Sequence, residues 1–372
     1  MTRLSDLFDV HGQSPWIDNI RRDWLNDGTL ARLVAEGVRG VTSNPSIFAK
    51  ALSSSNAYDA AIREAEAPDA ESLFETLAVR DVQDACDVLA AVYRASQDDV
   101  LGARRRHGDG YVSLEVSPHL AHDTEGTIAA ALRLWASVDR ANAMIKIPAT
   151  PEGLPAITEV LSHGVNVNVT LIFSVDRYAD VISAWAEGLI KAAEAGYDLR
   201  AIASVASFFV SRVDSAVDAL LAPDDPRRGH VANAQVALAY ETFLRLSAQV
   251  SVTALLAAGA QIQRPLWAST STKNPHYDEL LYVEALVAPE TVNTMPDATL
   301  AAAQAHGQFA DSMLANERER HSALRLLDDL APEVDLGALT ARLEREGVAA
   351  FVSSYDEVLA TVAATRLRVA GS

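Results

Sequence analysis

Lys146 is the residue of this 372-residue sequence whose setting is most suggestive of catalysis. It lies in the apolar segment 143–148 (AMIKIP), and burial among apolar side chains disfavours the charged form of a lysine. A neutral amine can form a Schiff base with a ketone, and the resulting iminium withdraws electrons from a neighbouring carbon–carbon bond. The segment therefore predicts either Schiff-base catalysis or a structural Lys–Glu ion pair.

Carbon–carbon cleavage beside an iminium also requires a general acid/base. Glu115 and Asp18 are the candidates, because each is a carboxylate in a strand-like run of the chain. Two histidines, His119 and His122, follow the run that contains Glu115 and could share a metal ion. Since no third histidine stands in a comparable position, we favour a site without metal.

Several predicted strands alternate polar and apolar residues, whereas strands of a parallel barrel are normally apolar on both faces. Because side chains alternate between strand faces, the apolar residues would face the helices and the polar ones the barrel interior. An antiparallel sheet with one solvated face would produce the same alternation. The polar residues expected to converge inside the barrel are Asp18, Asn44, Glu115, Lys146, Asn168, Thr170 and Ser207.

Short β-rich runs alternate with helical patterns eight times along the chain. This order indicates parallel βαβ units, and eight of them predict an α/β fold of the closed (β/α)₈ TIM-barrel type. An open doubly wound sheet is the alternative, although no G-x-G-x-x-G motif follows an early strand. The predicted strands are Trp16–Ile20, Val38–Ser43, Tyr111–Val116, Ala143–Ile147, Val165–Phe173, Ile202–Phe209, Pro265–Thr270 and Val292–Met295.

Additional helices accompany this plan, and we predict one domain over residues 1–372 with a C-terminal helical extension, 298–372, packed on the barrel. Two helices are expected between the second and third strands. The other clear helical patterns are Arg21–Glu36, Ser72–Ala95, Thr127–Val138, Val175–Ala195, Arg228–Ala258 and Tyr277–Val287.

The composition is strongly acidic, with 31 Lys and Arg against 50 Asp and Glu and a net charge of −19. Such a field repels nucleic acid and anionic membranes, so neither is an expected partner, and a phosphate site would need local cations. The basic run Arg104–Arg106 is interpreted as a solvated loop. Cys86, the one cysteine, is expected to be a buried thiol. Without a visible signal peptide or transmembrane segment, the cytoplasm is the predicted location.

Five segments in order along the chain resemble the motifs of the transaldolase family. The resemblance runs from about Trp16 to Met295, and the length with acidic C-terminal helices resembles the longer, bacterial and plant-like members. The segments are 40–48 (GVTSNPSIF), 145–150 (IKIPAT), 166–171 (NVNVTL), 207–212 (SFFVSR) and 267–275 (WASTSTKNP).

The resemblance implies transfer of a dihydroxyacetone unit from sedoheptulose 7-phosphate to glyceraldehyde 3-phosphate, without a cofactor. Lys146 would form the Schiff base, and Asp18 would exchange the proton of the C4 hydroxyl. Glu115 and Thr170 would hold the water that moves protons during imine formation. The implied substrate-binding residues are Asn44, Asn168 and Ser207 for the dihydroxyacetone unit, Phe209 as an aromatic lining, and Arg212, Ser271 and Lys273 for the phosphate.

Three residues depart from the family pattern: Phe208 stands for a proline, Ser211 for a glycine, and Lys273 for a frequent arginine. Two rival functions are a fructose 6-phosphate aldolase of the same superfamily and a sugar-phosphate-binding protein without turnover. The aldolases are shorter and usually carry a tyrosine near the water site, where this chain has Glu115. The oligomeric state, monomer or homodimer, is left open.

Overall fold

Seven parallel strands form one curled sheet in the computed structural model, which describes residues 2–102, 107–310 and 312–370. The order β1-β7-β6-β5-β4-β3-β2 follows the chain around the sheet, apart from β1, which lies beside β7. The strands are β1 (Gln13–Ile17), β2 (Val112–Glu115), β3 (Ala143–Pro148), β4 (Val167–Ile172), β5 (Ser204–Phe209), β6 (Arg264–Ala268) and β7 (Thr291–Met295).

An eighth segment closes the barrel between β1 and β2. Val41 forms parallel bridges to Ile17 on one side and to Val112 on the other, and its N–H donates to the Tyr111 carbonyl at 2.9 Å. The predicted strand Val38–Ser43 is therefore reduced to one bridging residue but occupies the predicted place. Hydrogen bonds on both of its sides exclude the open doubly wound sheet.

The closing segment is short because a helix starts directly after it. Asn44 caps α4 (Pro45–Ser54), with its side chain accepting from the Ile47 N–H at 3.1 Å. On the other side Gly40 crosses the ring of Trp16, where an added Cβ would lie 2.3 Å from a ring carbon. A larger residue at Gly40 would separate this segment from β1.

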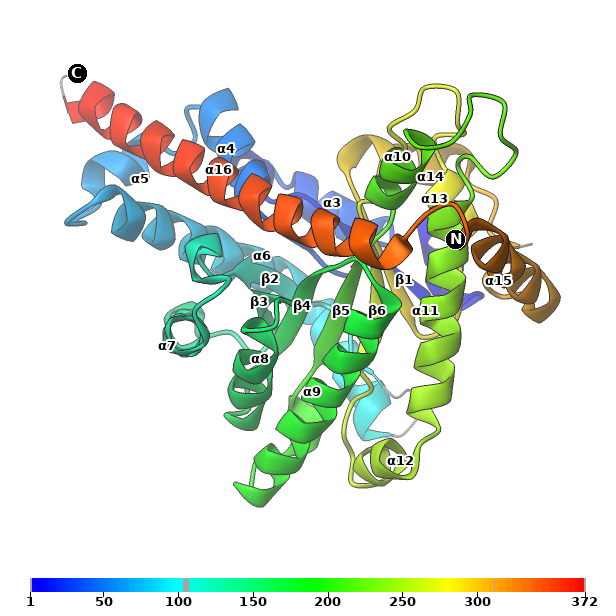
Figure 1. Ribbon diagram of the computed structural model, residues 1–372. Helices are drawn as coiled ribbons and strands as arrows, with labels where there is room; N and C mark the ends of the chain where they lie inside the picture. Colours follow the sequence, from blue (N-terminus) through cyan, green and yellow to red (C-terminus); the bar gives the residue numbers. More distant parts are fainter. Residues whose placement is uncertain (1, 103–106, 311, 371–372) are drawn as a thin grey trace.

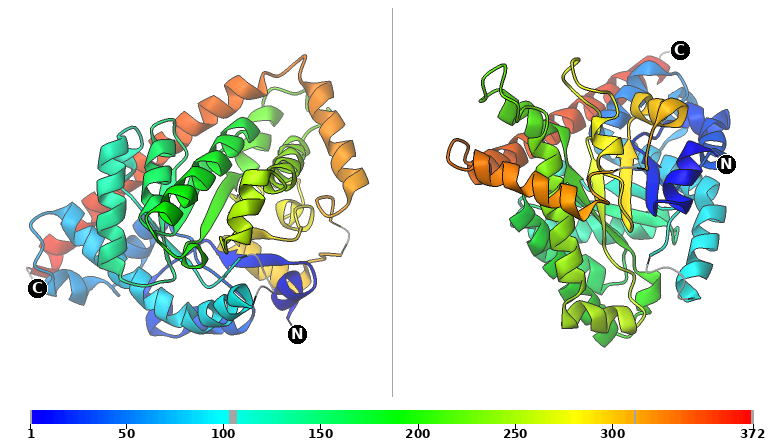
Figure 2. Two further views of the ribbon diagram at one scale, coloured as in Figure 1. Left: turned by 90° about the horizontal axis from the view of Figure 1, so that it is seen from below. Right: turned by 90° about the vertical axis from the view of Figure 1, so that its right-hand side faces the viewer.

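Helices surround the strands, as the view from below shows (Figure 2). Both faces of each strand are almost entirely buried, which is the expected state of a parallel sheet covered by helices. The principal outer helices are α6 (Ala70–Leu101), α7 (Thr124–Val138), α8 (Gly153–Ser162), α9 (Val175–Glu194), α11 (Val231–Ser247) and α12 (Val250–Ala257).

The strand predictions are largely confirmed, and those for α6, α7 and α9 identified real helices. Two expected long helices are wrong in extent. The run Arg21–Glu36 is broken into α2 (Arg22–Asn26) and α3 (Thr29–Ala35), because Gly28 adopts a left-handed conformation with φ of 79°. The run Arg228–Ala258 divides into α11 and α12.

Three further predictions need correction. Between the closing segment at Val41 and β2, the chain forms α4, α5 (Asp59–Glu64) and α6 in place of two helices. The predicted helix over Tyr277–Val287 shrinks to α13 (Leu281–Glu284), and the first strand begins at Gln13 instead of Trp16. The short elements not yet named are α1 (Arg3–Asp9), α10 (Ser211–Asp218), η1 (Pro118–Leu120) and η2 (Leu199–Ala201).

The C-terminal region forms α14 (Asp297–His306), α15 (Glu317–Leu330) and α16 (Leu336–Ala370). The helix α16 crosses the end of the barrel above the labelled strands (Figure 1). It contacts α4, α5, α6, η1 and β4 along its length. This helix therefore adds side chains to the end of the barrel at which the parallel strands finish.

The predictions for the single cysteine and for the basic run have different outcomes. Cys86 is fully buried, as expected, and burial raises the pKa of its thiol. Arg104–Arg106 lies outside the described residues. None of the helices in the described part of the chain combines the length and apolar character needed to cross a membrane.

Candidate active site

A polar pocket of about 210 Å³ opens at the carboxyl ends of the strands. Active sites of (β/α)₈ barrels lie at this end because the loops after the strands converge there. The pocket combines lysine, arginine and carboxylate side chains with hydroxyl groups and two phenylalanines. Its lining comprises Asp18, Thr42, Asn44, Ser46, Lys146, Thr170, Ser207, Phe209, Arg212, Ala268, Ser269, Ser271, Lys273, Thr294, Pro296 and Phe351.

Lys146 is held inside the barrel by β3, where it pairs in register with Glu115 on β2 and Asn168 on β4. Its side chain is 5% exposed. The Nζ atom donates to the Ser43 carbonyl at 3.0 Å and lies 3.5 Å from Glu115 Oε2. The amine is thus directed toward the pocket and contacts one carboxylate.

The two carboxyl groups near Lys146 both have raised pKa values. Burial raises the pKa of Glu115 to about 7, Lys146 opposes the shift, and Asp18 adds to it. Burial also raises the pKa of Asp18, against the effect of Lys146 and a hydrogen bond from Thr42. Glu115, whose pKa lies near neutrality, can both give and take a proton, which suits a general acid/base.

A chain of hydrogen bonds fixes Asp18. Thr42 Oγ1 donates to Asp18 Oδ1 at 2.7 Å and lies 2.6 Å from the hydroxyl of Thr294. The Asp18 backbone N–H donates to the Met295 carbonyl at 2.9 Å. Asp18 follows β1 directly, so the first and last strands and the closing segment together determine its position.

Asn168 and Ser207 form a second buried chain beside Lys146. The Asn168 amide donates to the Ser113 hydroxyl at 2.9 Å, and Ser207 donates to Asn168 Oδ1 at 2.7 Å. Asn168 is fully buried and is not among the residues that line the pocket. Ser207 lies between this chain and the pocket.

A β-bulge places Thr170 in the pocket. The register between β4 and β5 shifts between Val169 and Ile172, and Leu171 has a positive φ of 59°. Bulges commonly redirect a side chain next to an active site. Thr170 Oγ1 is buried and makes no hydrogen bond with any residue that the structure describes, so it is available to a water or substrate oxygen.

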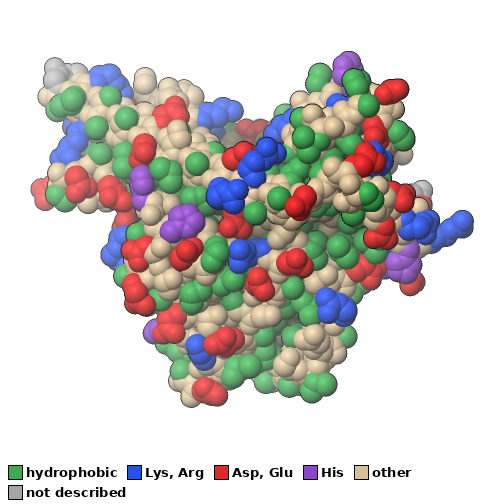
Figure 3. Space-filling model, viewed as in Figure 1, with side chains coloured by type: hydrophobic (Ala, Val, Ile, Leu, Met, Phe, Trp, Pro, Cys, Tyr) green, Lys and Arg blue, Asp and Glu red, His purple; other side chains and the backbone are tan. Residues whose placement is uncertain are grey.

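The rim of the pocket carries two cations. Lys273 donates to the Ser271 hydroxyl at 2.7 Å, and partial burial together with Arg212 lowers the pKa of Lys273. Burial lowers the pKa of Arg212, whose guanidinium carbon lies 5.8 Å from the Phe209 ring. Two adjacent cations that repel each other are suited to bind a dianion. Several Lys and Arg side chains also gather beside the notch on the upper surface (Figure 3).

The departures from the family pattern have local explanations. Phe208 is buried and packs edge-to-face against Trp267, on the side of β5 away from the pocket. The Ser211 hydroxyl lies 3.0 Å from that of Ser269, and its N–H donates to the Ser269 carbonyl. Both substitutions therefore leave the side chains of Ser207 and Arg212 in the pocket.

Nine of the eleven sequence-predicted site residues line the pocket; of the other two, Glu115 lies 3.5 Å from Lys146 Nζ and Asn168 accepts a hydrogen bond from Ser207. Sequence reasoning missed Thr42 and Thr294, which support Asp18, and Phe351, which enters from α16. The signal for Thr42 was its place in the polar run 42–44, two residues before Asn44. Phe351 had no comparable signal, because α16 is distant in sequence.

The two histidines considered as metal ligands point to different partners. His119 Nε2 lies 2.8 Å from Asp356 Oδ1, and His122 Nδ1 lies 3.0 Å from Glu152 Oε2. Both side chains are exposed. Among the described residues no cluster of three or more His, Cys, Asp or Glu side chains could hold a metal ion.

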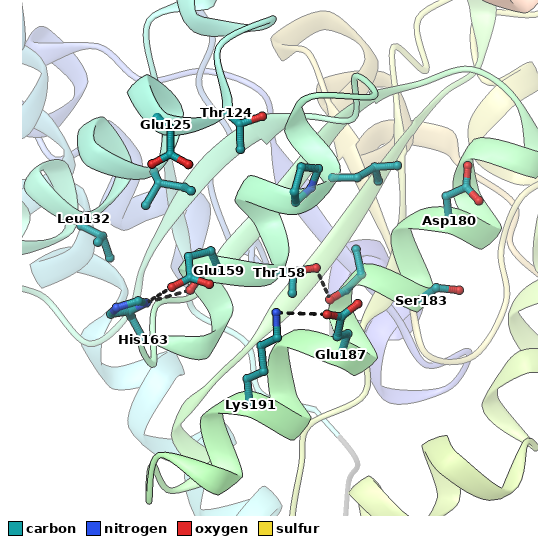
Figure 4. Close-up of a pocket in the computed structure, with 14 residues that line it drawn as sticks. Thr124, Glu125, Leu132, Thr158, Glu159, His163, Asp180, Ser183, Glu187 and Lys191 are labelled. Atoms are coloured by element: carbon teal, nitrogen blue, oxygen red, sulfur yellow. Dashed lines mark hydrogen bonds and ion pairs between the residues drawn. The ribbon is translucent and has the colours of Figure 1, made fainter.

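A larger hollow of about 860 Å³ lies outside the barrel, between α7, α8 and α9 (Figure 4). Two of its acids are already paired within it, Glu187 with Lys191 at 3.0 Å and Glu159 with His163 at 3.7 Å. It is open and lies on the helix layer, away from the strand ends. We therefore place the chemistry in the smaller pocket around Lys146.

Comparison with known proteins agrees with this geometry. Residues 15–362 match the family model described as Transaldolase/Fructose-6-phosphate aldolase. A protein of Saccharopolyspora erythraea named Transaldolase is 48% identical over 368 residues, covering 97% of each chain. Another of that name, from Thiobacillus denitrificans, is 46% identical over 359 residues, covering 94% of this chain and 97% of its own. A third, from Mycolicibacterium smegmatis, is 48% identical over 357 residues, covering 94% and 93%.

Proposed function

The chain belongs to the transaldolase/fructose-6-phosphate aldolase family, and we propose that it transfers dihydroxyacetone between sugar phosphates as a transaldolase. The donor is sedoheptulose 7-phosphate and the acceptor glyceraldehyde 3-phosphate, with erythrose 4-phosphate and fructose 6-phosphate as products. The observation that carries this proposal is a buried lysine amine 3.5 Å from a carboxyl group, in a pocket with two rim cations.

The reaction starts at Lys146. Its Nζ attacks the C2 carbonyl of the donor, and loss of water gives an iminium. Glu115 and Thr170 handle the protons of this step through a water molecule. Two observations support these roles: the raised pKa of Glu115 and the unpaired hydroxyl of Thr170.

Asp18 carries out the next proton transfer. It takes the proton of the C4 hydroxyl as the C3–C4 bond breaks, and the electron pair of that bond moves toward the iminium to give an enamine. The aldehyde product leaves, the acceptor aldehyde enters, and Asp18 returns the proton as the new bond forms. Water then hydrolyses the imine and frees Lys146. The hydrogen bond from Thr42 supports this role by fixing the orientation of the carboxyl group.

The remaining polar residues bind the two ends of the substrate. We assign Asn44, Asn168 and Ser207 to the dihydroxyacetone unit, because Asn44 and Ser207 line the pocket beside Lys146 and Asn168 accepts the hydrogen bond of Ser207. At the rim, Arg212, Ser271 and Lys273 bind the phosphate and Phe209 lines the passage. Local cations are needed there, since the chain carries a net charge of −19.

The whole chain contributes to this proposal. We propose one domain over residues 1–372, with the extension 298–372 packed on the barrel, because Phe351 of α16 reaches the pocket. We also propose that the protein works in the cytoplasm, where its one cysteine is expected to stay reduced.

Reductive trapping tests the mechanism. Borohydride added to the protein with fructose 6-phosphate should attach a dihydroxyacetone-derived mass to a peptide containing Lys146. Lys146→Ala should lose this adduct and all transfer, whereas Lys191→Ala, which removes a lysine paired with Glu187 on the outer surface, should keep both. A label on another lysine would overturn the mechanism.

A coupled assay separates the rival activities. Fructose 6-phosphate is supplied with and without erythrose 4-phosphate, and free dihydroxyacetone is measured beside transfer. A transaldolase needs the acceptor for turnover, whereas a fructose 6-phosphate aldolase would release dihydroxyacetone at the same rate without it. Absence of both activities would indicate binding without turnover.

A further inference from the structure

One face of the C-terminal helix α16 is directed into the mouth of the barrel. Gly347, Phe351 and Tyr355 are spaced four residues apart, so they lie on one side of the helix. An added Cβ at Gly347 would come within 3.2 Å of the Leu171 side chain and 3.3 Å of the Phe173 ring. The helix therefore passes very close to the end of β4, next to the bulge that positions Thr170.

Contacts within one and a half turns C-terminal to Phe351 hold this face in place. The Tyr355 hydroxyl donates to Glu71 Oε1 at 3.0 Å, and the hydroxyls of Ser354 and Ser46 are 2.7 Å apart. Asp356 accepts the contact from His119 at 2.8 Å. These contacts tie α16 to α6, α4 and the loop after β2, so the depth of Phe351 is set by three separate elements.

Phe351 lies directly over the amine. Its ring centre is 5.6 Å from Lys146 Nζ, and the residue is 5% exposed. Two polar groups also contact this amine, the Ser43 carbonyl and the Glu115 carboxyl group. Phe351 and Lys146 both line the pocket, so Phe351 places apolar surface beside the amine within it.

A transferase of this kind must protect its intermediate from water. After C3–C4 cleavage the three-carbon unit remains on Lys146 as an enamine and has two fates. It can attack the acceptor aldehyde, or it can take a proton at C3, add water at C2 and break the C2–N bond, which releases dihydroxyacetone and the free amine. Excluding solvent from an active site suppresses hydrolysis of such intermediates.

We propose that Phe351 is a positioning residue for reaction specificity: it covers the Schiff base at the mouth of the pocket and limits the entry of bulk water beyond the one water held by Glu115 and Thr170, so that the unit passes to an acceptor. This inference rests on the proposed transaldolase activity and goes beyond it by assigning the choice between transfer and hydrolysis to the C-terminal helix. The proposal requires a large apolar side chain at position 351 and does not require that this side chain be aromatic.

The test compares two substitutions of Phe351 with a matched control on the same helix. Phe351→Ala removes the cover, and Phe351→Leu keeps an apolar side chain of similar reach without the ring. Val358→Ala removes a fully buried apolar side chain of α16 that does not line the pocket. The measured quantity is free dihydroxyacetone released per transfer to erythrose 4-phosphate, at saturating fructose 6-phosphate.

We expect the ratio to rise at least about tenfold in Phe351→Ala, which corresponds to about 1.4 kcal/mol between the two barriers. Phe351→Leu and Val358→Ala should stay close to the unsubstituted protein. In acceptor-free reactions, the Schiff-base intermediate should form normally in Phe351→Ala but should be hydrolysed faster. Borohydride added at successive times measures how much of the intermediate remains. If Phe351→Ala does not fold, Phe351→Val takes its place in the test. The ratio of released dihydroxyacetone to transfer should then rise by a smaller factor.

An unchanged ratio in the folded Ala or Val variant would overturn the proposal, as would an equal rise in Val358→Ala. A rise in Phe351→Leu as large as in Phe351→Ala would also overturn it, because bulk would then not be the cause. Failure of the underlying function looks different: the unsubstituted protein would show neither transfer nor a trapped adduct on Lys146.

Discussion

The two ends of the barrel contain similar residue types in opposite electrostatic states. At the amino-terminal end of the strands, the side chain of Arg264, 2% exposed, donates to the Ser14 hydroxyl at 2.7 Å and to Asp109 Oδ1 at 3.2 Å. Arg39 and Trp16 donate to the same carboxylate, each at 2.9 Å. Although burial raises the pKa of Asp109, Arg264 and Arg39 outweigh it and hold the pKa well below its usual range.

At the carboxyl-terminal end the buried acids are not neutralised in this way. Glu115 has one cation at 3.5 Å, and Asp18 accepts a hydrogen bond from a neutral hydroxyl, so burial dominates and raises both pKa values. A fully paired buried network rigidifies the fold around it, whereas an incompletely paired group is costly to bury and remains available to a substrate. The comparison teaches that one end of the barrel supports the structure and the other supports the chemistry.

The largest expected effect is at the catalytic end. Asp18→Asn should slow carbon–carbon cleavage by ~10²–10⁴-fold, because it removes a positioned proton acceptor. Imine formation should persist, so rapid-quench borohydride trapping should accumulate the uncleaved substrate adduct. Since burial already disfavours ionised Asp18, the neutral asparagine should not lower the free energy of unfolding substantially. Transfer at the unsubstituted rate would remove Asp18 from its role.

At the amino-terminal end of the strands, a substitution should lower the stability of the fold. Asp109→Asn leaves Arg264 buried without its carboxylate, and breaking one side of a buried ion pair costs about 3–5 kcal/mol of unfolding free energy. Urea unfolding measures this loss. Asp87→Asn is the control, because its partner Arg140 is at the surface and exposed pairs contribute about 0–1 kcal/mol.

The pH dependence of that loss has a defined sign. Because Arg264 and Arg39 lower the pKa of Asp109, its stabilisation is present above the unfolded value of 3.8 and is lost as the pH falls through the folded value. The difference in unfolding free energy between Asp109→Asn and the unsubstituted protein should therefore stay constant near neutrality. It should narrow below pH 3.8. Equal losses in Asp109→Asn and Asp87→Asn would contradict a stabilising role for this end.

The two rim cations should affect binding of phosphorylated substrates. A charged hydrogen bond contributes about 1.5–3 kcal/mol, so Arg212→Ala and Lys273→Ala should each raise the KM for fructose 6-phosphate roughly 10- to 150-fold. Activity on the unphosphorylated sugar should change little. Lys273→Arg keeps the charge and offers a bidentate contact, so its KM should hold or fall. A large effect at Arg212 with none at Lys273 would exclude Lys273 from the phosphate site.

The smallest expected effect is a change in the pH profile. Since burial raises the pKa of Glu115 to about 7, one limb of the kcat/KM profile should lie near pH 7. Glu115→Gln should lose this limb, whereas Glu71→Gln, which changes an acid bonded to Tyr355 outside the barrel, should retain it.

Glu115 also affects stability with the opposite sign to Asp109. Its folded pKa lies above the unfolded value of 4.5, so its ionisation costs stability, and this cost develops as the pH rises from 4.5 through about 7. A limb near pH 7 that survives in Glu115→Gln would assign the titration to another group.

Much of the architecture follows from the sequence, for an identifiable reason. Strand and helix periods are local properties, so alternation of residues such as Asn166, Asn168 and Thr170 predicted both a strand and the face that turns inward. The same rule placed Lys146 and Glu115 inside the barrel. Errors fell where one residue changes the backbone, as at Gly28, or where a helix cap shortens a strand, as at Asn44.

Other features depend on contacts between distant segments and have no local signature. The bulge at Thr170 arises from the register between β4 and β5, and the closure at Val41 from hydrogen bonds to both neighbouring strands. The raised pKa of Glu115 depends on what buries it, and Phe351 reaches Lys146 from 205 positions further along the chain. The sequence by itself determined which residues could do chemistry and on which strand face they lie, because these properties repeat along the backbone. Only the tertiary structure decided their pairing, burial and cover, because these are set by side chains that the chain brings together from afar.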